Sequence, residues 1–84
     1  MVSDGDCVAI FHSIHRVMKA EKVLKTGGVD ILLIPVPRQL SSDCGLAIRF
    51  TAESRPELER VLGEAGLAIA EIWQKQAGSF SQLM

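Results

Sequence analysis

The chain has few cysteines, few aromatic residues and almost no excess charge. Its 84 residues include two cysteines, three phenylalanines and one tryptophan, and the formal net charge is −1. Two cysteines are too few for a disulfide framework. Because no basic patch is interleaved with aromatic residues, nucleic-acid binding has no electrostatic support. No apolar run approaches the roughly 20 residues of a membrane span, so we expect no membrane association.

Several motifs of common sites are also missing. Neither Cys-x-x-Cys nor His-x-x-x-His spacing occurs, so we expect no metal site. The glycine pair Gly27-Gly28 follows a predicted helix instead of preceding one, which removes the usual phosphate-binding loop. The opening residues 1–6 carry acids where a signal peptide needs bases, so we expect a cytoplasmic protein with reduced thiols. We expect no bound cofactor.

What the chain does have is enough apolar sequence for one small core. Hydrophobic residues make up 48% of the sequence and aromatic residues 5%, so the core should be mainly aliphatic. A chain of this length buries only about 60% of its unfolded surface. We expect a single domain over residues 1–73. Residues 74–84 have no usable periodicity and are predicted to be a C-terminal tail.

A strand and a helix are predicted at the start of the chain. The apolar run Cys7–His12 is rich in β-forming residues, which favours a strand. Ser13 can cap a helix that extends through Lys25, and Gly27-Gly28 is typical of its end. Met18 lies near helical spacing from the other apolar residues, so we expect it in the core.

Three strands and a second helix follow. Residues 31–34 form a short apolar run, and residues 46–51 alternate between apolar and polar, so both segments are predicted strands. Residues 54–57 carry a capping-box signature for a helix that ends at a glycine. Residues 67–73 are the last predicted strand. The core-facing stripe of the second helix is Leu58, Val61, Leu62 and Ala65.

The order β-α-β-β-α-β favours an α+β ferredoxin-like sandwich, in which a four-stranded antiparallel sheet has two helices on one face. A different α+β arrangement of the same elements is the alternative. Several strands carry apolar residues on both faces, for example Val8 and Ile10 against Ala9 and Phe11. One apolar face would then stay open unless the tail covers part of it through Phe80 and Leu83. Because the tail lacks periodicity, a symmetric homodimer through the open face is the expected remedy.

A polar, proline-containing segment, residues 35–45, lies between two of the predicted strands and holds Cys44. Most cysteines in small intracellular domains are buried and inert. Cys44 follows serines and an aspartate and precedes a glycine, which favours an accessible, reactive thiol. The alternative is an unreactive small residue that opens a strand. Cys7 has apolar neighbours in a predicted strand, so we expect it to be buried and unreactive.

The predicted topology gathers further candidate residues around Cys44. In this fold the third strand runs antiparallel beside the first, so its start should lie near His12 and the start of the first helix. A helix N-terminus with a nearby Arg or His lowers a thiol pKa from ~8.5 into roughly the 3.5–7.5 range. We therefore expect Cys44 to be the nucleophile, Gly45 to allow close approach to its sulfur, His12 and Arg38 to stabilise the anion, and Ser42 to donate a hydrogen bond.

Residues 35–38, 41–45 and 46–49 together resemble the signature of a small bacterial family, the putative selenium/sulfur (Se/S) carrier-like proteins, formerly a domain of unknown function. Residues 11–15 resemble the start of that family, and the likeness covers roughly residues 7–73. It implies a carrier that holds sulfur or selenium on Cys44 as a persulfide or perselenide. The implied partners are sulfur or selenium donor and acceptor proteins, and a sulfurtransferase-like activity is left open.

Two other functions remain as alternatives. The first is a non-enzymatic interaction or regulatory module that uses the open sheet face, since fold alone decides nothing about chemistry. The second is a redox-sensing thiol, which would lack a resolving cysteine unless Cys7 lies close to Cys44. Thiol reactivity in the folded protein separates the carrier from the interaction module, because a carrier needs Cys44 to be both exposed and acidic and an interaction module does not.

Overall fold

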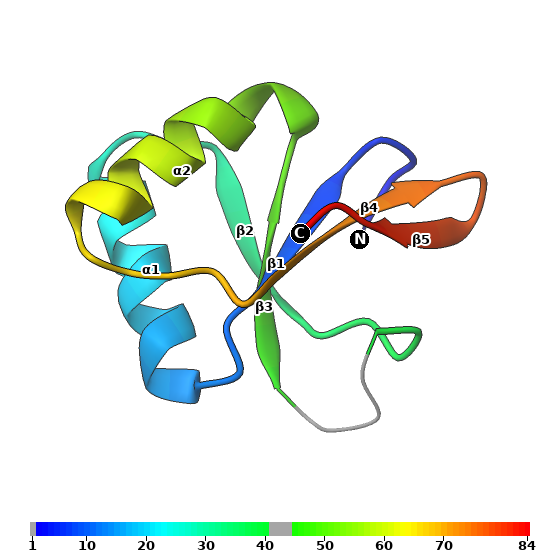
Figure 1. The fold of residues 1–84 in the computed structure, drawn as a ribbon, viewed down its shortest axis with the longest axis horizontal. Helices are drawn as coiled ribbons and strands as arrows, with labels where there is room; N and C mark the ends of the chain where they lie inside the picture. Colours follow the sequence, from blue (N-terminus) through cyan, green and yellow to red (C-terminus); the bar gives the residue numbers. More distant parts are fainter. Residues whose placement is uncertain (1, 41–44) are drawn as a thin grey trace.

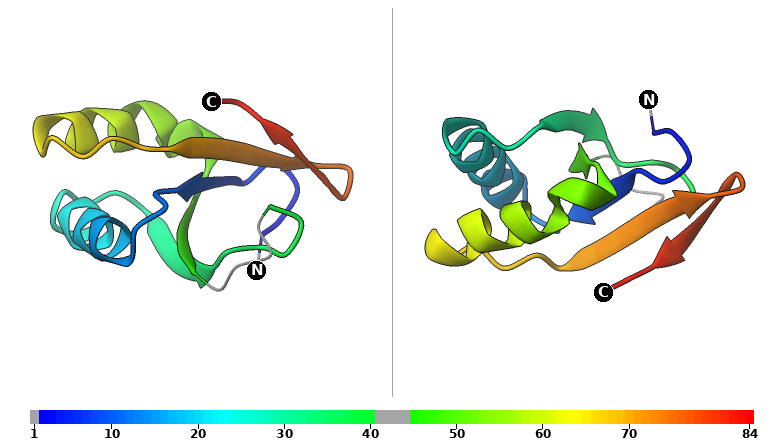
Figure 2. Two further views of the ribbon diagram at one scale, coloured as in Figure 1. Left: turned by 60° about the horizontal axis from the view of Figure 1, so that its bottom comes forward. Right: turned by 90° about the horizontal axis from the view of Figure 1, so that it is seen from above.

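The computed structural model describes residues 2–40 and 45–84. Both helices lie on one face of an antiparallel sheet whose strand order is β2-β3-β1-β4-β5 (Figures 1 and 2). The elements are β1 (Cys7–Ile10), α1 (Ile14–Thr26), β2 (Ile31–Pro35), β3 (Leu46–Phe50), the 3-10 helix η1 (Ala52–Ser54), α2 (Arg55–Glu64), β4 (Glu71–Gln76) and β5 (Ser79–Gln82). The predicted α+β class and antiparallel sheet are confirmed. Within the described residues, no helix is long and apolar enough to cross a membrane.

Strand β1 is the centre of the sheet. It pairs antiparallel with β3 on one side and with β4 on the other, so that Ala9 lies opposite both Ile48 and Ile72. All four residues of β1 are buried. Because β1 and β3 run in opposite directions, the start of β3 points toward the end of β1. This is the neighbourhood that the sequence predicted around the start of the third strand.

Helix α1 begins and ends as predicted. The Ser13 hydroxyl accepts a hydrogen bond from the Arg16 backbone N–H at 3.3 Å, which is the expected N-cap. Gly28 follows the helix with a φ of +77°, a conformation that side chains disfavour. The prediction that Met18 lies in the core is wrong, since this side chain is 46% exposed. Successive helical residues turn by about 100°, which carries Met18 off the buried stripe that includes Val17.

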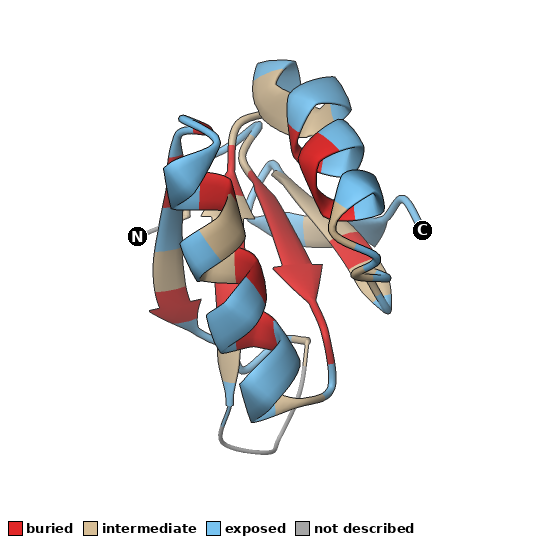
Figure 3. Ribbon diagram, turned by 90° about the vertical axis from the view of Figure 1, so that its left-hand side faces the viewer, coloured by how far each residue is buried: buried red, intermediate tan, exposed pale blue. Residues whose placement is uncertain are grey.

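The main core lies between the helices and the sheet. Each helix has a buried stripe facing the sheet and an outer surface facing solvent (Figure 3). The predicted stripe of α2 is confirmed for Leu58, Val61 and Leu62, whereas Ala65 follows the end of the helix and is only partly buried. The three buried residues share one cluster with Val17 and Leu24 of α1 and with Ile48 and Phe50 of β3.

The start of α2 differs from the predicted capping box. Helix η1 runs directly into α2, so Ser54 already has helical angles, with φ −81° and ψ −9°. A capping residue needs extended angles to turn its hydroxyl toward the first backbone N–H groups. The Ser54 hydroxyl bonds instead to the Thr51 hydroxyl at 2.9 Å. Glu57, the other half of the predicted box, pairs with Arg60.

The four-stranded prediction is wrong, because the described residues form five strands. The last predicted strand, residues 67–73, is shifted to Glu71–Gln76, and β5 forms within the predicted tail. Gln76 pairs with Ser79 across a two-residue turn at Ala77 and Gly78, whose φ values are +52° and +81°. Positive φ at both turn residues is the geometry of the commonest tight hairpins. Backbone pairing across this turn therefore forms β5 without an apolar pattern.

The second face of the sheet is covered by the chain itself. Four of its residues are buried, namely Val8, Ile10, Ile34 and Ala47. The partly buried side chains that pack over them are Val2, Val36, Leu40, Trp73 and Phe80. They come from the N-terminal segment, the connection after β2 and the β4–β5 hairpin, which lies over this side in Figure 2. The open apolar face on which the homodimer prediction depended is therefore not bare.

Candidate functional site

The candidate site lies at the edge where β1 ends, α1 begins and β3 starts (Figure 1). Gly45 immediately precedes β3, and its carbonyl accepts a hydrogen bond from the Val36 N–H at 3.0 Å. Arg38 is exposed in the connection that leaves β2 at the same edge. Cys44 and Ser42, two of the predicted site residues, lie outside the described residues.

Gly45 is exposed directly before the start of β3. Among the described residues, a Cβ built on Gly45 would meet Cγ2 of Val36 at 3.7 Å. That separation is an ordinary van der Waals contact. The described residues therefore leave room for an alanine side chain at this position.

His12 is held in an uncommon backbone conformation directly after β1. Its φ is +58°, in the left-handed region that residues with a side chain rarely adopt. Such a backbone conformation raises the conformational energy by on the order of 1–3 kcal/mol, and residues that adopt it cluster at functional sites. The conformation turns the chain from β1 into the cap residue Ser13, while the imidazole stays largely in solvent, 63% exposed.

Glu71 of β4 fixes the position of the His12 side chain. Its Oε2 lies 2.7 Å from Nε2 of His12, and its Oε1 accepts a hydrogen bond from Nε1 of Trp73 at 2.8 Å. The Glu71 side chain is only 25% exposed. Since both carboxylate oxygens are engaged, Glu71 cannot swing away without losing a bond to Trp73. When Nε2–H donates to Glu71, Nδ1 of a neutral imidazole is left as a proton acceptor.

Sequence reasoning missed Glu71. The β1–β4 register brings it to the site, because Ile10 pairs with Glu71 near the end of β1. The residue opens a strand that was predicted to begin four residues earlier, so no local pattern linked it to His12. A correct pairing of β1 with β4 would have been needed to find it.

The first turn of α1 gives this edge a positive character. It has no acidic residue, and it carries His15 and Arg16. The unpaired N–H groups of a helix N-terminus act as roughly half a positive charge, which adds to the side-chain charge of Arg16. The start of α1 therefore favours an anion beside it.

Cys7 is buried in the main core, as predicted. It is 1% exposed on the helix-covered face of β1. Burial raises the pKa of the Cys7 thiol above its ordinary value, and the nearby carboxylates of Asp6 and Glu53 raise it further. Arg55 acts in the opposite direction, but its effect is smaller than that of burial. A shielded thiol with a raised pKa is a poor nucleophile.

Comparison with known proteins gives one match. Residues 6–74 match the family described as "Putative Se/S carrier protein-like". No curated protein and no solved structure matches the chain. The matched range contains His12, Glu71, Cys7 and the whole segment from Arg38 to Gly45. Since it spans most of the 84 residues, the chain belongs to this Se/S carrier-like family.

Proposed function

We propose that the chain carries sulfur or selenium on Cys44, as a persulfide or perselenide, and passes it to an acceptor. The observation that carries this proposal is the burial of Cys7, which is 1% exposed with a raised thiol pKa. The sequence has two cysteines, so Cys44 is the one left for the chemistry that the family name describes.

The transfer needs only thiol exchange. The Cys44 thiolate attacks the outer chalcogen atom of a donor persulfide, and a new bond forms between Sγ and that atom. The bond inside the donor persulfide breaks, and the donor thiolate leaves with the electron pair. An acceptor thiolate then attacks the same outer atom and releases Cys44 as a thiolate. Electrons balance in both steps, so no external oxidant or reductant is consumed.

In this proposal each of the other predicted site residues has a role. His12 accepts the Cys44 proton at Nδ1, while Glu71 holds the ring and stabilises its charged form. Arg38 and the start of α1 stabilise the thiolate and the terminal chalcogen anion. Ser42 donates a hydrogen bond to that anion. Gly45, which has no side chain, keeps the approach to the sulfur open.

The alternative function, an interaction module that uses the open sheet face, loses its main support. That face is filled by Val36, Leu40, Trp73 and Phe80 of the same chain, packed over the buried residues of the sheet. The partners of a carrier are instead a chalcogen donor and an acceptor, which in this proposal meet the protein at the candidate site, where β1 ends and β3 starts.

Mass spectrometry of the intact protein tests the proposal. After incubation with a small-molecule persulfide donor, the wild-type protein and Cys7→Ala should each gain the mass of one sulfur atom. Cys44→Ser, the matched variant that retains Cys7, should gain none. Loading of Cys44→Ser to the wild-type level would contradict the proposal.

A second arm of this experiment measures the loading rate as a function of pH. Removing a general base lowers a reaction rate by about 100-fold or more. His12→Gln should therefore load sulfur about 100-fold more slowly than the wild type. The loading rate of Glu71→Gln should lie between those of His12→Gln and the wild type, because His12 stays in place as the base but loses the carboxylate that orients it. Equal rates for all three proteins would remove His12 from the mechanism.

A further inference from the structure

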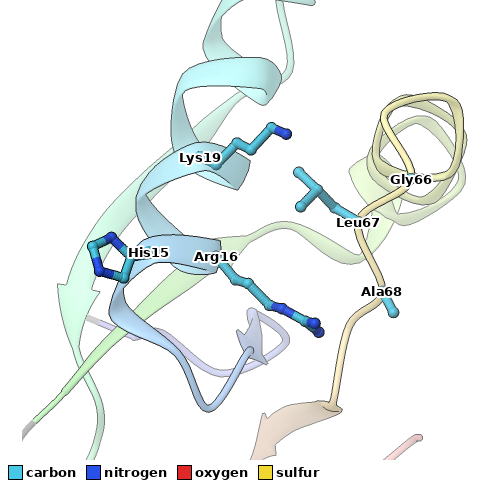
Figure 4. Close-up of a pocket in the computed structure, with 6 residues that line it drawn as sticks. All are labelled: His15, Arg16, Lys19, Gly66, Leu67 and Ala68. Atoms are coloured by element: carbon cyan, nitrogen blue, oxygen red, sulfur yellow. The ribbon is translucent and has the colours of Figure 1, made fainter.

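A groove separates α1 from the connection between α2 and β4. It is lined by His15, Arg16 and Lys19 on one side and by residues 66–68 on the other, and its volume is about 450 Å³ (Figure 4). Leu67 packs against the main core and forms the apolar wall. The groove lies beside the first turns of α1, so it is close to the edge that holds the candidate site.

The groove is cationic. Among the described residues, each titratable side chain in its lining is basic, and no acidic residue lines it. Arg16 and Lys19 are exposed, and neither forms an ion pair within residues 2–40 and 45–84. The other face of the same helix differs, since Lys25 pairs there with Glu21 at 2.8 Å. Arg16 and Lys19 therefore border the groove without an ion pair among the described residues, whereas Lys22, also without one there, lies outside it.

The arrangement of the two cations favours an extended ligand over a single small anion. In Figure 4, Arg16 and Lys19 both reach toward the chain at 66–68, but their charged ends lie on either side of Leu67. One phosphate or sulfate ion would need donors that converge on it. An extended peptide places alternate side chains roughly 7 Å apart on one face. Two acidic side chains at that spacing could meet one cation each.

We propose that this groove docks an acidic, extended segment of the protein that donates chalcogen to Cys44 or accepts it. The inference rests on the proposed carrier function, and it adds the chemistry by which the partner is recognised. The acidic side chains pair with Arg16 and Lys19, and the peptide backbone between them crosses Leu67, while the intervening side chain points away from the groove. Docking there brings the partner's reacting thiol to the end of the molecule where β1 ends and β3 begins.

Fluorescence anisotropy tests the docking with the full chain. The probe is a labelled octapeptide of alternating glutamate and leucine, and its control has glutamine in place of every glutamate. Lys19→Gln and Arg16→Gln should each weaken binding of the acidic peptide by about threefold, the effect of one exposed ion pair. The matched control is Lys22→Gln, which removes one lysine from the exposed surface of α1 outside the groove and should leave the affinity nearly unchanged.

Three results would overturn the docking proposal. The first is equal weakening by Lys22→Gln, which would mean a general attraction to α1. The second is equal binding of the glutamine peptide, and the third is displacement of the acidic peptide by inorganic phosphate at micromolar concentration, which would mean a small-oxyanion site.

The carrier function can fail separately from the docking. Cys44→Ser should bind the peptide normally, and Lys19→Gln should load normally from a small-molecule donor. Peptide binding without any loading of the wild type would refute the carrier and leave the groove intact.

Discussion

In the Cys44→Ser variant, the remaining thiol Cys7 should be alkylated at least about a thousandfold more slowly in the native protein than in the unfolded protein. Cys7 is 1% exposed, and it lies in the central strand, where it pairs with Phe50 on one side and with Gln74 on the other. A reagent can reach the sulfur only when β1 leaves the sheet. Because that opening removes the centre of the core, we take it as global unfolding.

The stability of a domain sets the size of this protection. The free energy of unfolding of a domain is roughly 0.05–0.15 kcal/mol per residue. A chain of 84 residues should therefore have a free energy of unfolding of at least about 4 kcal/mol. Each 1.4 kcal/mol is about a factor of ten in the equilibrium constant, which gives an open fraction of about one in a thousand or less.

Timed alkylation with iodoacetamide, followed by intact-mass measurement, gives this ratio directly. The matched variant Cys7→Ala isolates Cys44, whose rate should be similar in native and unfolded protein or faster in the native one. Its pH profile should show an apparent pKa below ~8.5. Native-state alkylation of Cys7 within about tenfold of its unfolded rate would refute the reasoning, since it would mean that β1 opens far more readily than its burial implies.

Two further predictions concern stability and assembly. The pKa of the Cys7 thiol is raised in the folded protein, so the stability that the neutral thiol contributes is complete below the ordinary thiol pKa of ~8.5 and is lost as the pH rises through the folded-state pKa. Urea unfolding should therefore show a steeper loss of stability at alkaline pH for the wild type than for Cys7→Ala. Parallel stability curves for the two proteins would contradict this prediction. Because Phe80 helps to cover the second sheet face, the wild type should sediment as a 9.1 kDa monomer at micromolar concentration. The variant Phe80→Ala should be less stable to unfolding by about 1–3 kcal/mol and should self-associate through the uncovered face. A wild-type mass near twice that value would contradict the monomer and support the homodimer that the sequence predicted.

Local signals predicted the helices and the first three strands because each is set by neighbouring residues. The Ser13 cap and the buried stripe of α1 follow from side-chain chemistry and the helical period. Strand β5 gave no such signal, since it is held by backbone pairing across a turn that needs positive φ at Ala77, a residue that seldom adopts it. For the same reason the sequence favours a dimer over a cover by the tail through Phe80, because Phe80 and Leu40 must fold back onto the second face from segments without periodicity.

The candidate site was predicted in part. The order of the strands was sufficient to expect Gly45 near the end of β1 and Cys7 in the core. The bond between His12 and Glu71 depends on which residue of β4 faces Ile10, and register between strands distant in sequence is decided by packing of the whole sheet. The left-handed backbone of His12 was likewise hidden, since nothing in its own sequence neighbourhood demands it.

The central position of β1 also has a consequence for synthesis of the chain. The first strand to leave the ribosome must wait for its two neighbours, since Cys7 pairs with Phe50 and Gln74 near the other end of the sequence. At roughly 5–20 residues per second, that delay lasts several seconds. During this time the sheet does not yet shield the thiol of Cys7. Closure of the sheet around β1 then buries that thiol to 1% exposure.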